Sequence, residues 1–275
     1  MTIGKSQLVP GYHHIHMLNG YAFPKEKSTI FKYMALDRFV QSVDNGVLVF
    51  VSPETWYDPF EQLYFGIDCS SRGYTNEDIA CMCVSEKSST NEDASWKVYA
   101  GSNNKSVRIS YEQDKLLQLL EDYAERNGFE VYIGKVDYSF EKRKIESLHL
   151  MSSPHYKDYF PDLMTREHYL SLMLLKRMAF SYENEVRLFM VKNKIPFDSN
   201  NLLKISCDYR GLGIISNVML SPYPPVRDKD KQACMDREKK NKTESDKIKK
   251  KLNSKLNCRI QQSQLYKVRP RVERV

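Results

Sequence analysis

The sequence predicts an α+β fold in a single domain, with mixed short-stranded sheets and peripheral helices. Its 275 residues are 41% hydrophobic, which is enough to bury a sizeable core in one domain. Short β-branched runs such as Val47–Val51 and amphipathic segments such as Asp114–Asn127 follow one another without a regular strand–helix–strand alternation. The chain has no internal repeats, so a solenoid or propeller is not expected.

The first half of the chain begins with an irregular arm, residues 1–29, because glycines and prolines interrupt every apolar run there. Apolar or alternating runs then predict strands, and the spacing of apolar residues predicts helices, one of which stops at Asn45-Gly46. In order, these are strands Ile30–Met34, Val47–Val51, Ile79–Ser85, Val107–Tyr111 and Glu130–Val136, and helices Asp37–Val43, Ala94–Ala100 and Asp114–Asn127.

The second half is read in the same way. His168–Ala179 is strongly apolar and predicts a helix, and Lys229–Leu256 is a lysine-rich helix. The β-branched and aromatic content of Tyr182–Val191 predicts a strand. Further strands are predicted at Leu202–Ser206, Val218–Ser221 and 258–268, so the domain extends over 30–268 and is followed by a tail, 269–275.

The net charge of +7 is unevenly distributed. Residues 226–275 hold 17 Lys and Arg against 7 Asp and Glu, whereas the rest of the chain holds 25 against 28. A positive segment of this kind attracts nucleic acid, and Lys247, Lys249, Lys250 and Lys251 are the predicted contacts. The alternative is a solvated helix face that binds nothing.

The composition also predicts the cellular location and argues against disulfide and metal sites. No run of 18 apolar residues exists and the N-terminus lacks a signal pattern, so no membrane span and a cytoplasmic location are expected. Six cysteines without a C-x-x-C pair argue against a disulfide framework or a zinc ribbon. His13, His14 and His16 have no carboxylate or cysteine at ligand spacing, so no metal is expected.

Four motifs occur in order along the chain, at Phe31–Met34 with Gly46–Glu61, at Cys81–Glu86 with Trp96, Tyr99 and Ala100, at Tyr182–Leu188, and at Gln262–Tyr266. Together they resemble the bacterial domain-of-unknown-function family DUF2971. In that family they correspond to a "YKY…NDPFE" opening, a "C-x-S-E…MWxxYA" unit, a "YExEWRL" strand and a closing strand. Tyr57, Ser95, Ser106 and Val186 depart from the family's usual residues.

The Glu183-x-Glu185 pair is the strongest candidate for catalytic residues in this sequence. On a strand these two carboxylates and Arg187 would share one face. The pair resembles the third motif of mono-ADP-ribosyltransferases. That resemblance implies that Glu185 stabilises the ribosyl cation formed from NAD and that Glu183 activates the acceptor. The alternative is an edge strand whose charged residues pair on a solvated face.

The same motif order implies a binding site for NAD as substrate. Lys32 and Arg187 would hold phosphate, Ser85 would bind ribose or carboxamide, and Tyr33, Trp96 and Tyr99 would frame nicotinamide. The alternative for the two residues Trp96 and Tyr99 is core packing on one helix face.

Asp58 either caps a helix that begins at Pro59 or brings a carboxylate into the same site.

The resemblance therefore implies an NAD-dependent mono-ADP-ribosyltransferase with an ADP-ribosyltransferase-like core. Its setting would be a toxin or phage-defence effector that modifies nucleic acid or a translation component. One alternative is a non-catalytic nucleic-acid- or protein-binding module of a defence or toxin–antitoxin system, with an antitoxin as partner. A nuclease, with the carboxylates holding a metal, is a third reading.

Overall fold

A computed structural model describes residues 5–22, 28–56, 58, 61, 76–86, 92–99, 105–140, 165–222 and 231–265. The described residues form helices and a mixed sheet with both parallel and antiparallel strand pairs, so the α+β prediction is confirmed. An ADP-ribosyltransferase-like core stays a prediction. No helix within the described ranges is both long and apolar enough to span a membrane.

The chain divides into two compact units that interleave along the sequence. The first unit takes its described residues from Met1–Phe31, Val47–Thr90 and Glu112–Cys207, and the second from Lys32–Gly46, Asn91–Tyr111 and Asp208–Val275. Neither unit is a contiguous stretch of sequence, so each is described by itself.

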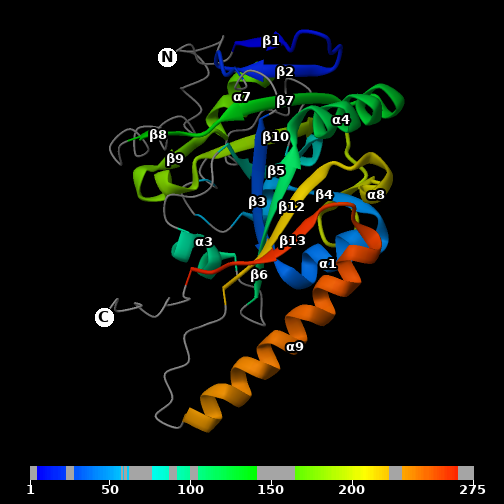
Figure 1. The fold of residues 1–275 in the computed structure, drawn as a ribbon. Coiled ribbons are helices and arrows are strands. Elements are labelled where there is room, and N and C mark those ends of the chain that lie inside the picture. Colours follow the sequence, from blue (N-terminus) through cyan, green and yellow to red (C-terminus); the bar gives the residue numbers. More distant parts are fainter. Residues whose placement is uncertain are drawn as a thin grey trace. The chain divides into compact units, whose positions relative to one another are not determined.

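The first unit is built on a sheet in the order β1-β2-β7-β10-β5, with β4 pairing both β5 and β11 (Figure 1). β10 lies antiparallel between β5 and β7, and all seven of its residues are buried. The elements of this unit are β1 (Ser6–Leu8), β2 (Ile15–Leu18), the start of β3 (Thr29–Ala35), β4 (Val47–Val51), η1 (Pro53–Thr55), η4 (Asn76–Asp78), β5 (Ile79–Ser85), α4 (Gln113–Asn127), β7 (Glu130–Lys135), β8 (Asp137–Phe140), α7 (Arg166–Leu172), β9 (Leu175–Arg177), η7 (Met178–Glu183), β10 (Glu185–Val191) and β11 (Leu202–Ser206).

Both faces of β10 are buried, and one of them packs in a large apolar cluster. Residues two apart on a strand share a face, so Phe189 and Val191 point the same way as Glu185 and Arg187. Phe189 and Val191 pack with residues of β5 and with Tyr169, Leu170 and Met173 at α7 in one buried apolar cluster. Glu185 and Arg187 therefore lie on the same face of β10 as this cluster, at the N-terminal end of the strand.

The N-terminal residues differ from the predicted irregular arm. Part of the segment forms β1 and β2, which pair antiparallel, and β2 also pairs in parallel with β7. The Pro10-Gly11 pair that suggested irregularity lies in the connection between these strands, where Gly11 adopts a φ of 86°. Ile15 and Leu18 are fully buried, and their burial anchors the strand to the sheet.

The segment His168–Ala179 was predicted to be a single helix, but in the structure it is divided between three elements. The helix ends at Leu172, and β9 and the 3-10 helix η7 follow it. β9 pairs with β8, and the Asp137 N–H donates to the Leu174 carbonyl oxygen at 2.7 Å. An apolar run looks alike in a buried helix and in a buried strand, which is why the pattern alone misassigned this segment.

The second unit combines the end of β3 with a small sheet in the order β6-β12-β13. β12 lies antiparallel to β6 and parallel to β13, the predicted closing strand, whose last predicted residues, 266–268, lie outside the described ranges. The other elements are α1 (Leu36–Asn45), α3 (Glu92–Val98), β6 (Ser106–Glu112), α8 (Tyr209–Leu212), β12 (Ile215–Leu220), α9 (Lys231–Lys255) and β13 (Arg259–Gln262).

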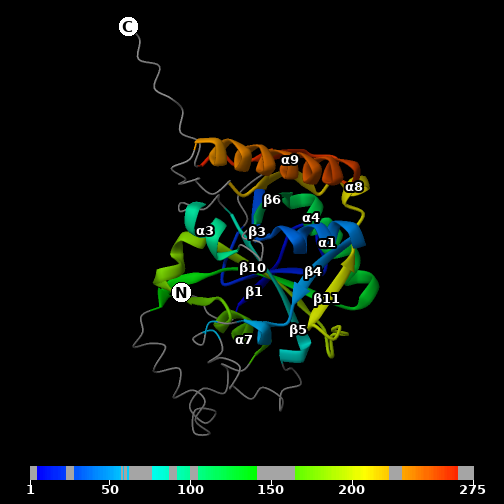
Figure 2. The ribbon, with the colours of Figure 1, turned by 90° about the horizontal axis from the view of Figure 1, so that it is seen from below.

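The long helix α9 docks on its own unit through a few residues. Leu252 and Leu256 are buried, and the Ser245 hydroxyl donates to Gln262 of β13 at 2.9 Å. Figure 2 shows α9 along its length, in orange. The prediction of a tethered lysine-rich helix that leads into a paired strand is confirmed.

Candidate functional site

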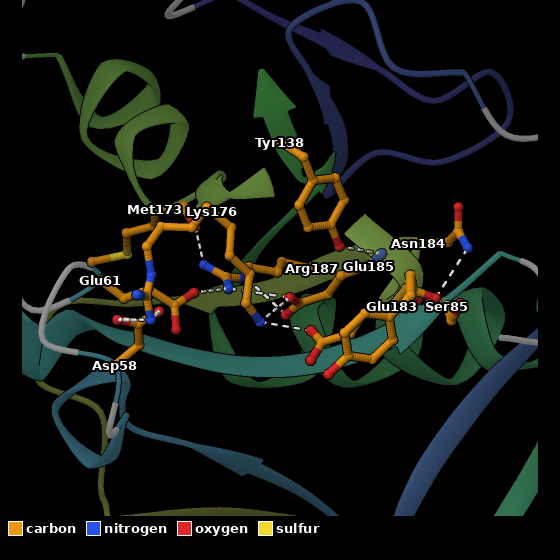
Figure 3. A network of polar contacts seen from close by, with 12 residues as sticks. Asp58, Glu61, Ser85, Tyr138, Met173, Lys176, Glu183, Asn184, Glu185 and Arg187 are labelled. Atoms are coloured by element: carbon orange, nitrogen blue, oxygen red, sulfur yellow. Dashed lines mark hydrogen bonds and ion pairs between the residues drawn. The ribbon is translucent and has the colours of Figure 1, made fainter. Parts of the chain in front are cut away.

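The first unit holds a buried network of charged side chains centred on Arg187 (Figure 3). Arg187 is 1% exposed and is the largest of the fully buried side chains. Its Nε donates to Glu185 Oε1 at 2.9 Å, and its Nη2 donates to Glu185 Oε2 at 3.3 Å and also to Glu61. A buried guanidinium persists only where its donors find partners, and these contacts meet that need.

Two further contacts fix the guanidinium. Its Nη1 donates to the carbonyl oxygen of Met173, directly after α7, and its plane lies 4.2 Å from the centre of the Trp56 ring. Arg187 was predicted to hold phosphate. Its donors already bind groups inside the protein, so the geometry supports a role in positioning Glu185 instead.

Lys176, on β9, joins the two predicted catalytic carboxylates. Its Nζ donates to Glu183 Oε2 at 2.7 Å and to Glu185 Oε2 at 2.9 Å. The side chains of Lys176 and Glu183 are 11% and 8% exposed, against 5% for Glu185. Lys176 and Glu183 are therefore slightly more accessible to solvent than Glu185.

The two glutamates come together in a different way from the one predicted. The strand begins at Glu185 and not at Tyr182, because η7 extends to Glu183 and Asn184 adopts a left-handed φ of 45°. Glu183 and Glu185 are thus not strand neighbours on one face. A turn brings them together, and Lys176 bridges their carboxylates.

Neighbouring groups hold this turn in place. The Ser85 hydroxyl donates to the carbonyl oxygen of Glu183 at 2.7 Å, and the N–H of Glu185 donates to Tyr138 Oη at 2.9 Å. Ser85 also lies opposite Glu185 in the β5–β10 register. Its hydroxyl thus supports the carboxylate pair through the backbone.

The two glutamates differ in protonation. Burial would raise the pKa of Glu185, but the charges of Arg187 and Lys176 outweigh burial and hold that pKa below its ordinary value. Burial raises the pKa of Glu183, and the nearby Glu185 charge adds to the rise against the opposing Lys176. Glu185 is therefore the carboxyl that stays ionised to lower pH, and Glu183 is the carboxyl of the pair that takes up a proton more readily.

The charge of the inner network is also unbalanced. Three carboxylates (Glu61, Glu183 and Glu185) face two cations (Lys176 and Arg187). Burial of an unbalanced charge is costly, so a proton on Glu183 or a positive charge brought by a ligand would be stabilised here. No group of three or more His, Cys, Asp and Glu side chains in the described part of the chain is arranged to hold a metal ion.

Asp58 lies at the edge of the network. Its carboxylate accepts from Arg177 Nη2 at 3.1 and 3.2 Å, and both Lys176 and Arg177 lie 5.1 Å from the centre of the Phe180 ring. The Glu61 N–H donates to the Asp58 carbonyl oxygen at 3.0 Å, so one turn supplies both acids. The intervening Pro59 and Phe60, like Tyr57, lie outside the described residues.

The remaining predicted cofactor residues belong to the second unit. The Tyr33 ring meets Trp96 edge-on with centroids 5.2 Å apart and stacks on Tyr99 at 6.1 Å. Tyr33 and Trp96 are 8% and 3% exposed, and neither Tyr33 Oη nor Trp96 Nε1 has a hydrogen-bond partner among the described residues. Lys32, on β3, is half-buried. The three aromatic residues thus pack against one another, as the core alternative expects, and their role in framing nicotinamide stays a prediction.

Sequence reasoning missed several members of the network, namely Trp56, Glu61, Tyr138, Lys176 and Arg177. Glu61 was quoted within a motif, but nothing in that motif pointed to Arg187, which is 126 residues away. For Lys176, the assignment of its segment to a helix hid the β9 strand that directs it to the glutamates.

Residues 95–188 match the family model described as "Protein of unknown function (DUF2971)". The matched segment contains Trp96 and Tyr99 as well as Glu183, Glu185 and Arg187. The resemblance read from the motifs is therefore confirmed over this segment. No curated protein and no solved structure matches the chain.

Proposed function

We propose that this protein is an NAD-dependent mono-ADP-ribosyltransferase whose reaction takes place at Glu183 and Glu185. NAD would be a substrate, and the acceptor would be a nucleic acid or a component of translation. By the family resemblance, the setting would be a bacterial toxin or phage-defence system.

One observation carries the proposal. Two carboxylates, bridged by the Lys176 ammonium at 2.7 and 2.9 Å, have pKa values displaced in opposite directions. Transfer of a glycosyl group uses such a pair, because one group must stay anionic beside a cationic transition state while the other moves a proton.

The proposed reaction divides these tasks between the two residues. The bond from the anomeric carbon to the nicotinamide nitrogen breaks, and its electron pair leaves with nicotinamide. Glu185, kept ionised by Arg187, stabilises the positive charge that develops on the ribose. The acceptor then bonds to the anomeric carbon and loses its proton to Glu183, whose raised pKa makes it a stronger base than an ordinary carboxylate.

The experiment is to incubate the purified protein with NAD, with and without nucleic acid or lysate, and to follow nicotinamide release. Glu185→Gln keeps size and removes charge, so we expect a loss of about 100-fold or more in turnover. Glu183→Gln should impair transfer to the acceptor more than it impairs nicotinamide release.

The matched control is Glu125→Gln, which makes the same substitution at an exposed position of α4. Its turnover should equal that of the unmodified protein. Release of nicotinamide by Glu185→Gln at the rate of the unmodified protein would remove Glu185 from the reaction.

A non-catalytic nucleic-acid-binding module is the second candidate. The observation in its favour is that Arg187 and Glu185 already pair with each other inside the protein, as in a purely structural ion-pair network. This candidate predicts that the unmodified protein releases no nicotinamide under any condition, and that Glu185→Gln changes stability alone.

A further inference from the structure

Six of the nine lysines of α9 form two groups that the sequence alone did not separate. One group docks the helix on its own unit. Lys251 Nζ lies 2.5 Å from Asp44 Oδ2 and Lys255 Nζ lies 3.0 Å from Asp44 Oδ1. Hydrogen bonds from both lysines lower the pKa of Asp44. Lys251 therefore acts within the fold, although the sequence pattern placed it among the nucleic-acid contacts.

The second group points away from the docked side. Lys239, Lys240, Lys247 and Lys250 are exposed, and none of them joins an ion pair within the described residues. We call these four the outer lysines. Lys249, which was also predicted to bind nucleic acid, is half-buried and lies 3.9 Å from Asp246.

Helix geometry arranges the outer lysines in two rows. Lys240 and Lys247 are seven residues apart and Lys239 and Lys250 are eleven apart, which is close to two and three full turns. At about 1.5 Å per residue, the rows extend over roughly 10 and 16 Å. Buried Ser245 and Leu252 lie on the opposite side of the helix, and buried Leu256 directly follows its end. The result is a positive strip on the solvent side of α9.

Three exposed acids among the described residues neighbour this strip. Glu244 is paired with Lys105, whose hydrogen bond is the main cause of its lowered pKa, and Asp246 lies 3.9 Å from Lys249. Asp236 lies four residues before Lys240 and offsets part of the positive charge of the strip. Leu252 is buried in docking, so the strip lacks the apolar residues with which an amphipathic helix inserts into a membrane. The lysines can therefore make contacts with phosphate groups by charge alone, and a nucleic-acid backbone presents such groups in a continuous row.

We propose that the outer lysines of α9 bind the phosphate backbone of nucleic acid without reading its sequence. A duplex carries one negative charge per about 1.7 Å of its axis, so several phosphates face a strip of this length. Lysine suits this role because it is a point charge on a flexible stem that adapts to the spacing of phosphates. The inference goes beyond the proposed NAD chemistry, because it concerns α9 alone and does not require Glu185 to react.

The test compares Lys247→Gln/Lys250→Gln with the unmodified full chain by fluorescence anisotropy on a short DNA duplex of arbitrary sequence. Loss of two phosphate contacts should lower the slope of log affinity against log salt by about 2. Affinity at about 0.1 M salt should fall by roughly 10-fold or more. A second duplex of different sequence should give the same affinity.

The matched control is Lys115→Gln/Lys194→Gln, which removes the same charge from exposed positions of the first unit. It should change affinity by less than about 2-fold, because the charges removed lie outside the strip. Exposed Lys→Gln changes leave folding intact, which a thermal melt would verify.

Three results would overturn the proposal. One is equal binding of Lys247→Gln/Lys250→Gln and the unmodified protein at every salt concentration. Another is an equal loss in the control variant, which would make the effect one of net charge. The third is binding to vesicles containing phosphatidylserine with no binding to the duplex. None of these three results bears on the proposed NAD reaction, because the binding assays contain no NAD.

Discussion

Replacement of Arg187 by Met removes the charge at the centre of the network and keeps a long side chain. Arg187 is 1% exposed and its ion pairs are with Glu185 and Glu61, whose side chains are 5% and 8% exposed. After the substitution, two buried carboxylates lose their guanidinium partner and Lys176 is the remaining cation of the inner network.

The expected loss follows from these contacts. Removal of one partner from a buried ion pair costs about 3–5 kcal/mol, because the other charge is left uncompensated. Domains are stable by about 5–15 kcal/mol, so Arg187→Met should remove about a fifth or more of the total. Arg187→Lys keeps the charge and loses the forked contacts, and it should cost less than Arg187→Met.

The pH dependence has a definite sign. The pKa of Glu185 is held below its ordinary value of about 4.3, so its pairing stabilises the protein above that pH and the stabilisation is lost as pH falls through the lowered pKa. The destabilisation by Arg187→Met should therefore be greatest near neutral pH. It should shrink as pH falls, because burial raises the pKa of the carboxylates that have lost Arg187 and they then take up protons.

Urea unfolding at neutral and acidic pH measures both effects, with Arg38→Met at an exposed position of α1 as control. Arg38→Met should change the free energy of unfolding by no more than about 0.5 kcal/mol. A loss below about 1 kcal/mol for Arg187→Met at neutral pH, or a loss that does not vary with pH, would refute the description of this network.

Three smaller predictions concern the same unit. Asn184→Ala should destabilise the protein by about 1 kcal/mol because of the left-handed φ of 45°, whereas Asn184→Gly should not, and thermal melts of the pair decide this. Glu183→Gln should be at least as stable as the unmodified protein. Because ionisation of Glu183 opposes folding, this advantage should grow as pH rises through the raised pKa. Urea midpoints measured across pH test this, and a difference that does not vary with pH would contradict it. Gly134→Ala on β7 should cost about 1–3 kcal/mol in urea unfolding, because its Cβ would overlap the Leu174 side chain, and a neutral result would show that Leu174 moves aside.

Local patterns predicted the local features of this protein. The β-branched run Val47–Val51 is β4, and the helix that follows β6 ends where Gly128 adopts a φ of 67°. The spacing of Glu185 and Arg187 also placed both on one face of β10, where they pair. Periodicity and turn residues act over a few positions, and these features depend on nothing further.

The rest of the site depends on contacts between distant segments. Glu61 and Lys176 reach the carboxylates and Arg187 only because the sheet order and the short β9 strand bring their segments together. The residues next to Glu61 and Lys176 in the sequence do not indicate which charged partner either side chain has. The turn at Asn184 was hidden for a different reason, since the alternation of its neighbours resembles that of a strand.

Site-specific NMR titration of the side-chain carboxyl carbons of Glu183 and Glu185 tests the division of roles between the two glutamates most directly. Glu183→Gln identifies one of the two signals, because it removes the Glu183 resonance. We expect Glu185 to remain ionised down to a pH below the ordinary range and Glu183 to titrate above it. Titration of both carboxyls near the ordinary value of about 4.3 would contradict the split protonation and, with it, the assignment of anion and base to this pair.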